Sequence, residues 1–417
     1  MNITQLRNRT AAVIAIASIA TAAVSTLGST AGATLAQATT TTTTTAPPNP
    51  PTTLGPQYAI RSVESGWDHT CALRADGIVA CWGAGSHGRL GNGGTAKQTA
   101  AVVVRGLSGV RQLASGSHST CALTWNREVF CWGRNNRGQL GDGTTTDRTT
   151  PVKLALSGVS LLAVGNNHAC AASGSTLRCW GANESGQLGT NDTQDRTAPV
   201  VVGLGDRDFV ALGAFNTSTC GQTASGLTAC SGSNLGMFGN GSLAGSTSFK
   251  TVPTLSAGTD PTVVEGSTHR CHAESTTGQV RCVGSNGNGG LGDGTNLTRT
   301  TPVSPPGVFS MATSGYSNVS CGFERVARQY RCWGSNISGQ VGDGTTTSRT
   351  TPVAVRGIPT MNQTTGSVSA GRNHACAVYD PGAYLPDQVY CWGSDNTGQL
   401  GNGAGGSSTT AVLVQGL

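Results

Sequence analysis

The stretch from residue 119 to residue 144 reads STCALTWNREVFCWGRNNRGQLGDGT, and versions of it recur along most of the chain. It contains two cysteines, and all 14 cysteines of the chain fall into seven consecutive pairs. The first cysteine of a pair recurs after 50, 49, 50, 51, 50 and 55 residues. A fixed period near 50 marks a repeat architecture, in which each unit needs its neighbours to cover its apolar face. The pairs are Cys71 with Cys81, Cys121 with Cys131, Cys170 with Cys179, Cys220 with Cys230, Cys271 with Cys282, Cys321 with Cys332 and Cys376 with Cys391.

Each unit divides into short apolar segments. In a representative unit these lie at 102–104, 110–113, 120–123 and 128–132, and a polar, glycine-rich loop follows. Four short strands at regular spacing are typical of a propeller blade and not of a helical solenoid. The sequence therefore predicts an all-β fold, a seven-bladed β-propeller with four-stranded antiparallel blades. The cysteines would lie on the last two strands of each blade.

The paired cysteines are predicted to form one disulfide per blade. Cys71 and Cys81 lie symmetrically about the turn at 74–77. Residues opposed across an antiparallel strand pair come within disulfide reach. Each disulfide would close a short loop and stabilise the fold by roughly 2.5–3 kcal/mol. Zinc binding is the alternative, but the cysteine and histidine spacings of zinc motifs are absent.

The two ends of the repeat region predict how the ring closes. Six units open with an apolar strand, such as the one at 199–202, whereas the first unit begins at Tyr58 without one. A surplus copy of this strand stands at 411–417. We therefore expect the C-terminal strand to pair in the first blade, which would hide both sheet edges.

The N-terminal region has the pattern of an export signal. In residues 1–38, two arginines precede an uncharged apolar run of 17 residues, and small residues lead to a predicted cleavage after Ala38. An uncleaved anchor is the alternative, since 17 residues is the lower limit for a membrane span. Residues 39–57 form a Thr/Pro-rich linker, either a stalk or an export spacer. The propeller would occupy 58–417, in a protein that is secreted or cell-wall associated and not inserted in the membrane after cleavage.

Composition and repetition argue against several function classes. Charged residues make up 11% of the chain, the net charge is +6, and no basic run is present, so nucleic-acid binding is not expected. Four histidines precede the first cysteine of a pair by two residues, and separate blades would hold them too far apart for one metal ion. We expect each ring to hydrogen-bond a neighbouring turn. These histidines are His69, His168, His269 and His374.

Acidic and basic residues recur together in the glycine-rich loop. They are expected to form an Asx-turn with a surface ion pair, because each loop supplies a single carboxylate where calcium needs six to eight oxygens. No catalytic set, cofactor or metal site is predicted, and the chain is interpreted as a non-enzyme. The pairs are Asp142 with Arg148, Asp293 with Arg299 and Asp343 with Arg349.

Two motifs resemble the repeats of the regulator of chromosome condensation family. They are the segment from Cys131 to Thr144 and the segment from His69 to Leu73. The resemblance covers all seven units and implies a seven-bladed propeller. It is weaker in units 4 and 5, where Ser231 and Val283 replace the tryptophan that follows the second cysteine.

The resemblance implies function less directly than fold. The founding eukaryotic member of that family is a guanine-nucleotide exchange factor that binds chromatin. Secreted bacterial members are more similar to this chain, and some inhibit β-lactamases through their blade loops. A binding scaffold, an exchange factor and an inhibitor therefore remain as alternatives. An extracellular hydrolase would need a clustered acid–base pair that no segment supplies.

Departures from a repeat are where an asymmetric site is expected. They are apolar or aromatic here, which is typical of a binding surface and not of an acid–base pair. The candidate partner-binding residues are Met237 and Phe238 in unit 4 and Tyr384 and Leu385 in unit 7. Repeat decay is the alternative for unit 4. The predicted partner of this monomer is an extracellular protein or a cell-wall glycan.

Overall fold

A computed structural model describes residues 59–203, 208–252, 268–273, 277–316, 318–361, 366–382 and 385–417. The predicted signal and linker, residues 1–57, lie outside this part of the chain. The one helix within it is η1 (Ser86–Gly88), a single turn. The strands, blade by blade, are β1 (Ile60–Ser65), β2 (His69–Arg74), β3 (Val79–Gly83), β4 (Gln98–Val103); β5 (Val110–Ser115), β6 (Ser119–Thr124), β7 (Val129–Gly133), β8 (Arg148–Lys153); β9 (Leu161–Val164), β10 (His168–Ser173), β11 (Thr176–Gly181), β12 (Arg196–Val202); β13 (Phe209–Ala214), β14 (Ser218–Thr223), β15 (Thr228–Gly232), β16 (Ser246–Val252); β17 (His269–Ala273), β18 (Val280–Gly284), β19 (Arg299–Val303); β20 (Phe309–Ser314), β21 (Val319–Glu324), β22 (Gln329–Gly334), β23 (Arg349–Ala354); β24 (Val368–Ala370), β25 (His374–Tyr379), β26 (Gln388–Gly393) and β27 (Ser408–Leu413).

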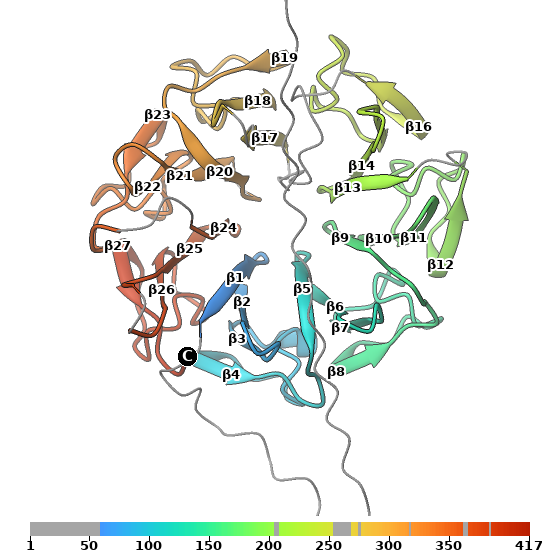
Figure 1. Cartoon of the computed structure of the whole chain (residues 1–417), viewed down its shortest axis with the longest axis horizontal. Helices are drawn as coiled ribbons and strands as arrows, with labels where there is room; N and C mark the ends of the chain where they lie inside the picture. The colour runs from blue at the N-terminus through green and yellow to red at the C-terminus, as the bar shows by residue number, and fades with distance from the viewer. Residues whose placement is uncertain are drawn as a thin grey trace, which may run out of the picture. The chain divides into compact units, whose positions relative to one another are not determined.

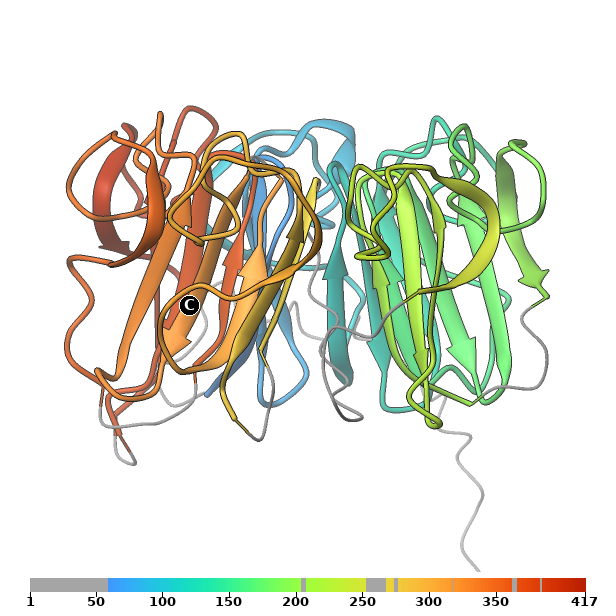
Figure 2. The ribbon, with the colours of Figure 1, turned by 90° about the horizontal axis from the view of Figure 1, so that it is seen from above.

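These strands form seven antiparallel sheets arranged in a ring, a seven-bladed β-propeller as predicted (Figure 1). Six of the sheets have four described strands, and the fifth has three, preceded by residues 253–267 outside the described part. The first strand of each blade lies innermost and the last lies at the rim. Seen from the side, the strands run between the two ends of the ring, where the turns and loops gather (Figure 2).

The blade boundaries differ from the prediction by one strand. The apolar strand that was expected to open a unit is the rim strand of the blade before it, as β4 pairs with β3 in blade 1. The glycine-rich loop causes this, because it brings the chain back antiparallel to the strand it has just left. The cysteines consequently lie on the two central strands of each blade, not on the last two.

The predicted closure by the C-terminal strand is wrong for the same reason. β27 pairs with β26 and completes blade 7, while β1 to β4 form blade 1 without it. Two of the backbone hydrogen bonds that join these blades lie near the rim. The Gly403 N–H donates to the Thr99 carbonyl at 2.7 Å, and the Ala101 N–H donates to the Gln415 carbonyl at 2.9 Å.

Every blade seam carries the first of these bonds. The loop of one blade donates a backbone N–H to a threonine carbonyl on the rim strand of the next, at 2.7 to 2.9 Å in all seven seams. The donors and acceptors are Gly93 to Thr149, Gly143 to Thr197, Asn191 to Thr247, Gly241 to Thr300, Gly294 to Thr350, Gly344 to Thr409 and Gly403 to Thr99. The ring is therefore closed by repetition of one contact and not by strand exchange.

Each blade holds one disulfide between its two central strands, and the pairing is the one expected from the sequence. The two Cα atoms of each pair lie 4.0 to 4.1 Å apart, because the cysteines face each other directly across the antiparallel ladder. Only the place of the cysteines in the blade differs from the prediction, because both lie on central strands. The bonds join Cys71 to Cys81, Cys121 to Cys131, Cys170 to Cys179, Cys220 to Cys230, Cys271 to Cys282, Cys321 to Cys332 and Cys376 to Cys391.

The disulfides and the repeated tryptophan both pack across the blade seams. The disulfides are buried against the following blade, as Cys376 and Cys391 pack against Trp82 of blade 1. The Trp180 Nε1–H donates to the Gln139 carbonyl of the preceding blade at 3.0 Å, and a Cβ on Gly141 would lie 2.7 Å from the Trp180 ring. Glycine is therefore required at this position.

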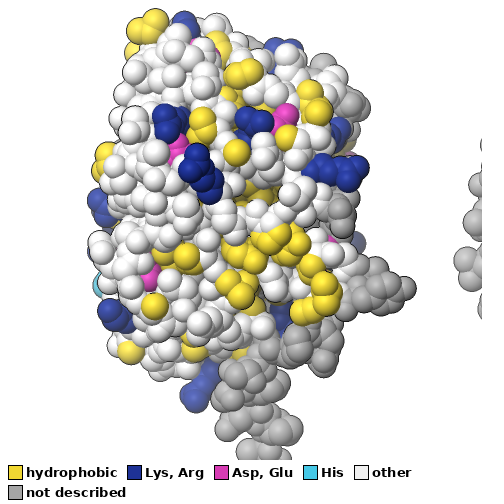
Figure 3. Space-filling view, turned by 90° about the vertical axis from the view of Figure 1, so that its left-hand side faces the viewer, with side chains coloured by type: hydrophobic (Ala, Val, Ile, Leu, Met, Phe, Trp, Pro, Cys, Tyr) yellow, Lys and Arg dark blue, Asp and Glu magenta, His cyan; other side chains and the backbone are white. Residues whose placement is uncertain are grey.

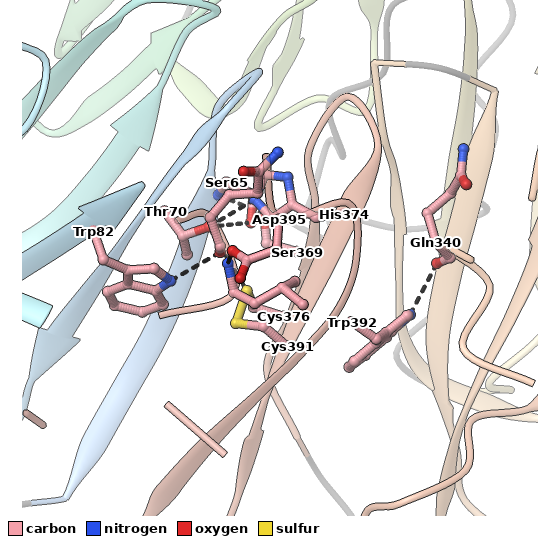
Figure 4. Close-up of a disulfide and its surroundings, with 12 residues drawn as sticks. Ser65, Thr70, Trp82, Gln340, Ser369, His374, Cys376, Cys391, Trp392 and Asp395 are labelled. Atoms are coloured by element: carbon pink, nitrogen blue, oxygen red, sulfur yellow. Dashed lines mark hydrogen bonds between the residues drawn. A yellow bond between two sulfur atoms is a disulfide. The ribbon is translucent and has the colours of Figure 1, made fainter. Parts of the chain in front are cut away.

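The four repeated histidines are fully buried, and each bonds the next blade instead of a turn. Their Nε2 atoms form hydrogen bonds with Thr120, Thr219, Ser320 and Thr70 at 2.7 to 3.0 Å. Histidine thus stands in blades 1, 3, 5 and 7 and its hydroxyl partner in blades 2, 4, 6 and 1. Figure 4 shows the last of these seams, where the Thr70 hydroxyl contacts both the His374 ring and Cys376 of the Cys376–Cys391 disulfide.

The aspartate and arginine of the glycine-rich loop form more than the predicted surface ion pair. The Asp142 carboxylate is only 4% exposed and accepts hydrogen bonds from Thr144, Asn135 and Arg148. Burial acts to raise the pKa of Asp142, but these hydrogen bonds outweigh it and the pKa is lowered. The Asx-turn is present, and its carboxylate organises the loop that reaches the next blade.

Candidate binding site at the base of blade 7

The base is defined as the end of the ring that holds the turns between the second and third strands and the linkers between blades. Blade 7 has the longest of these turns, residues 380–387 between β25 and β26. The cysteines that flank it are 15 residues apart, whereas those of the other blades are 9 to 11 apart. This added length sets blade 7 apart from the repeat.

A pocket of about 210 Å³ opens beside this turn. Its lining includes Asp380 and Asp387 of the turn, Ile60 and Arg61 at the start of β1, and Met361 of the β23–β24 linker. The Ile60 N–H donates to one carboxylate oxygen of Asp387 at 2.8 Å. Burial, and then the charge of Asp380, raises the pKa of Asp387 although the Ile60 bond opposes this. The two carboxylates give the pocket an acidic wall.

An apolar surface flanks the turn on the side that faces blade 6. The Tyr379 and Tyr390 rings meet edge to face with centroids 6.0 Å apart, and Ile358 packs on the same cluster. Leu413 pairs with Tyr390 across the sheet and is 45% exposed. Figure 3 shows hydrophobic side chains gathered on the side of the molecule formed by blades 6 and 7. Half-buried aromatic rings and an exposed leucine beside a polar pocket are typical of a protein-binding surface.

The residues predicted for partner binding have different outcomes. Leu385 lies on the blade 7 turn and is 64% exposed, so it is accessible to a partner. Tyr384 lies outside the described residues. Met237 and Phe238 were wrongly predicted, because both are almost fully buried in a cluster with Phe215, Cys220 and Val252. Phe238 occupies the position of the buried leucine of other repeats, such as Leu140.

Replacing Phe238 by alanine should therefore act on stability alone. We expect the free energy of unfolding to fall by about 3–5 kcal/mol, as for other buried phenylalanines. Chemical denaturation followed by tryptophan fluorescence would measure this, and Leu235→Ala, an exposed neighbour, is the matched control. A stability equal to that of the parent would contradict the assignment of Phe238 to the core.

Sequence reasoning missed Tyr379, Tyr390 and Leu413. The signal was present in the repeat alignment, since the Tyr390–Leu413 pair corresponds to Arg178–Val201 in blade 3 and Arg331–Ala354 in blade 6. A comparison at equal repeat positions, strand by strand, would have found it. These departures are substitutions within strands and leave the length of the unit unchanged.

Within the described ranges, no group of three or more His, Cys, Asp or Glu side chains is placed to hold a metal ion. Nor does that part of the chain contain a helix long and apolar enough to cross a membrane.

The fold defines a class, a seven-bladed propeller with one disulfide in each blade. Two family models for the regulator of chromosome condensation (RCC1) repeat match the chain. The matches cover residues 128–172 and 332–378, and residues 60–89, 110–139 and 367–399. These segments of the chain are RCC1 repeats. No curated protein sequence matches the chain.

Three solved structures of similar fold are of eukaryotic proteins. Prp20p from Saccharomyces cerevisiae has a TM-score of 0.69 at 19% identity, covering 82% of this chain and 87% of its own; it was described together with its binding properties to Gsp1p and histones. The same yeast protein bound to Kap60 has a TM-score of 0.68 at 17% identity, and the match covers 86% of this chain and 84% of the yeast chain. Human WBSCR16 has a TM-score of 0.66 at 19% identity, and the match covers 78% of this chain and 89% of the human chain. At these identities the likeness concerns the fold.

Proposed function

We propose that this chain is an extracellular, non-enzymatic scaffold that binds a partner protein through the base of blade 7. The observation that carries the proposal is the concentration, at the base of the ring, of departures from the repeat in one blade. The long 380–387 turn, the exposed Leu385 and the Tyr379–Tyr390 pair all belong to blade 7. A ring of near-identical blades needs no such difference for its own stability.

The composition of this surface favours a protein over a glycan. Its centre is aromatic and aliphatic, and a small polar pocket lined by Asp380, Asp387 and Arg61 lies beside it. Seven disulfides support an extracellular site of action, because such bonds persist in oxidising compartments. Exchange-factor activity has only the likeness of fold, at 19% identity, in its favour.

The Leu385→Asp variant should test this surface. A charge at the centre of an apolar contact removes a hot spot, so we expect capture of partner proteins from the native extracellular medium to fall at least 10-fold. Quantitative mass spectrometry of the captured proteins would measure the change for each protein. The melting temperature should stay unchanged because Leu385 is exposed.

Val326→Asp is the matched control. Val326 is 77% exposed on the corresponding turn of blade 6, so its substitution adds the same charge one blade away. We expect it to leave capture intact. Equal capture by the Leu385→Asp variant, or equal loss in both variants, would exclude the base of blade 7 as the contact.

A further inference from the structure

A second set of departures lies at the opposite end of the ring, around the axis. There the turns between the first and second strands of the blades meet. Blades 2, 3 and 4 place Ser117, Asn166 and Asn216 at the first position of this turn. Blades 1, 6 and 7 place Trp67, Tyr316 and Arg372 at the same position. We call Trp67, Tyr316, Arg372 and the adjoining His118 the axial cluster.

The axial cluster is assembled from four blades and held in place by hydrogen bonds. The Arg372 guanidinium lies 5.1 Å from the centroid of the Trp67 ring, and the His118 ring lies 5.0 Å from it. Tyr316 meets Trp67 edge to face at 6.5 Å, and its hydroxyl donates to the Ser115 carbonyl of blade 2 at 3.1 Å. Blades 6 and 2 are not neighbours in the ring, so this bond crosses the axis.

The backbone fixes the same side chains. The Arg372 N–H donates to the Trp67 carbonyl, and the Trp67 N–H donates to the Ser117 carbonyl, both at 3.2 Å. The Arg134 N–H donates to the His118 carbonyl at 3.0 Å. These bonds join blades 7, 1 and 2, so the cluster is preorganised and a ligand would order little on binding.

Positive charge converges on this cluster. Arg89 stands where blades 2, 3, 6 and 7 have glutamine, and Arg134 stands where other blades have alanine or serine. Arg89 is only 2% exposed, and its Nη1 has no hydrogen-bond partner among the described residues. Two carboxylates lie nearby. Asp147 binds His87 at 2.7 Å, and the negative charge of Asp68 opposes the lowering of the Arg89 pKa by burial.

The pKa of His118 reflects these positive charges. Burial, and then the charges of Arg89, Arg134, His87 and Arg372, lower its pKa to about 3. The histidine is therefore neutral at pH 7, and the positive potential comes from the three arginines.

We propose that the axial cluster binds a uronic acid residue of an acidic polysaccharide. Guanidinium groups bind a carboxylate through paired hydrogen bonds. Aromatic rings beside them favour a ligand that carries an apolar ring face next to its carboxylate, which a uronic acid does. An acidic peptide shares the carboxylate but lacks the rigid apolar face. This site lies at the other end of the ring from the base of blade 7, and the two proposals stand independently.

Isothermal titration of the full chain with trigalacturonic acid, in low salt at pH 7, would test the proposal. We expect binding to the acid and at least 10-fold weaker binding to its carboxyl-reduced, neutral form. Arg372→Asn should weaken binding to the acid at least 10-fold, and Arg89→Gln, which removes a buried charge, should weaken it less. Both variants install a residue that other blades carry at the same position, so they should fold.

Arg127→Asn is the charge-matched control, since it removes one positive charge from an exposed turn at the base. We expect it to bind trigalacturonic acid as the parent does. Failure to bind the acid, unchanged binding by Arg372→Asn, or equal loss in Arg127→Asn would overturn the proposal. Tighter binding of a polyglutamate peptide than of the sugar, with the same loss in Arg372→Asn, would reassign the cluster to an acidic peptide.

Discussion

Deleting residues 411–417 should lower the melting temperature by on the order of 10 °C. The deletion removes Ala411 and Val414, which are buried, and with them Val412, which packs against the same clusters. It also removes backbone bonds from Ala411 to Arg356, from Val414 to Val389 and from Ala101 to Gln415. At about 1 kcal/mol for each hydrogen bond and about 1.5–3 for each valine, the loss is roughly 7 kcal/mol. Differential scanning calorimetry would measure it.

Hydrogen exchange in the same deletion variant distinguishes the two ways of closing the ring. Because β27 pairs with β26, amides in Gln388–Gly393 should lose protection first. Those of β3 in blade 1 should stay protected, since β4 still covers them. A loss of protection confined to β3, or an unchanged melting temperature, would contradict the observed strand order.

Acidification should destabilise the propeller between about pH 6.5 and pH 4. Burial lowers the pKa of His168 and His269 to about 4, that of His374 to about 3, and that of His69 well below its usual range. In the unfolded chain these groups titrate near 6.5, so the unfolded state binds protons first as the pH falls. The stabilisation is complete above pH 6.5 and is lost progressively toward the folded-state pKa. Each histidine contributes about 1.4 kcal/mol per pH unit.

A single substitution isolates this contribution from groups that act the other way, such as Glu64, whose pKa burial raises to about 8. His374→Gln keeps a nitrogen near the Thr70 hydroxyl but cannot titrate. Between pH 6 and pH 4 we expect this variant to lose about 3 kcal/mol less stability than the parent. Guanidinium denaturation at each pH would measure the difference.

Thr70→Val is the control for the histidine prediction. It removes the hydroxyl partner of His374 and leaves the ring able to titrate. It should lower stability at every pH without flattening the dependence on pH. A His374→Gln variant with the slope of the parent would show that His374 does not remain neutral in the folded ring.

Much of the fold could be predicted because it depends on local pairing within one unit. The cysteine pairs follow from spacing about a hairpin turn, as Cys71 and Cys81 show. The blade boundary could not be predicted from the same information. A rim strand such as β4 is joined by loops of similar composition on both sides, and only its hydrogen bonds to β3 decide its blade.

The candidate site was predictable in part, since the insertion in unit 7 is visible as a length. The departures in units 4 and 7 differ in burial. Phe238 of unit 4 replaces a core leucine, whereas Leu385 of unit 7 extends from a turn. The axial cluster escaped prediction for another reason. Its members come from blades 1, 2, 6 and 7, and only ring closure brings Trp67 next to Arg372.

The alternation of histidine and hydroxyl along the blades limits how such a ring can change size. Loss of blade 2 alone would set His69 against Ala169, an apolar neighbour that offers no hydrogen bond to a fully enclosed imidazole. Loss of blades 2 and 3 together would set His69 against Thr219 and keep the link intact. Duplication or excision of blades is therefore tolerated best in pairs of about one hundred residues. In each pair one blade supplies the histidine and the next supplies its hydroxyl partner.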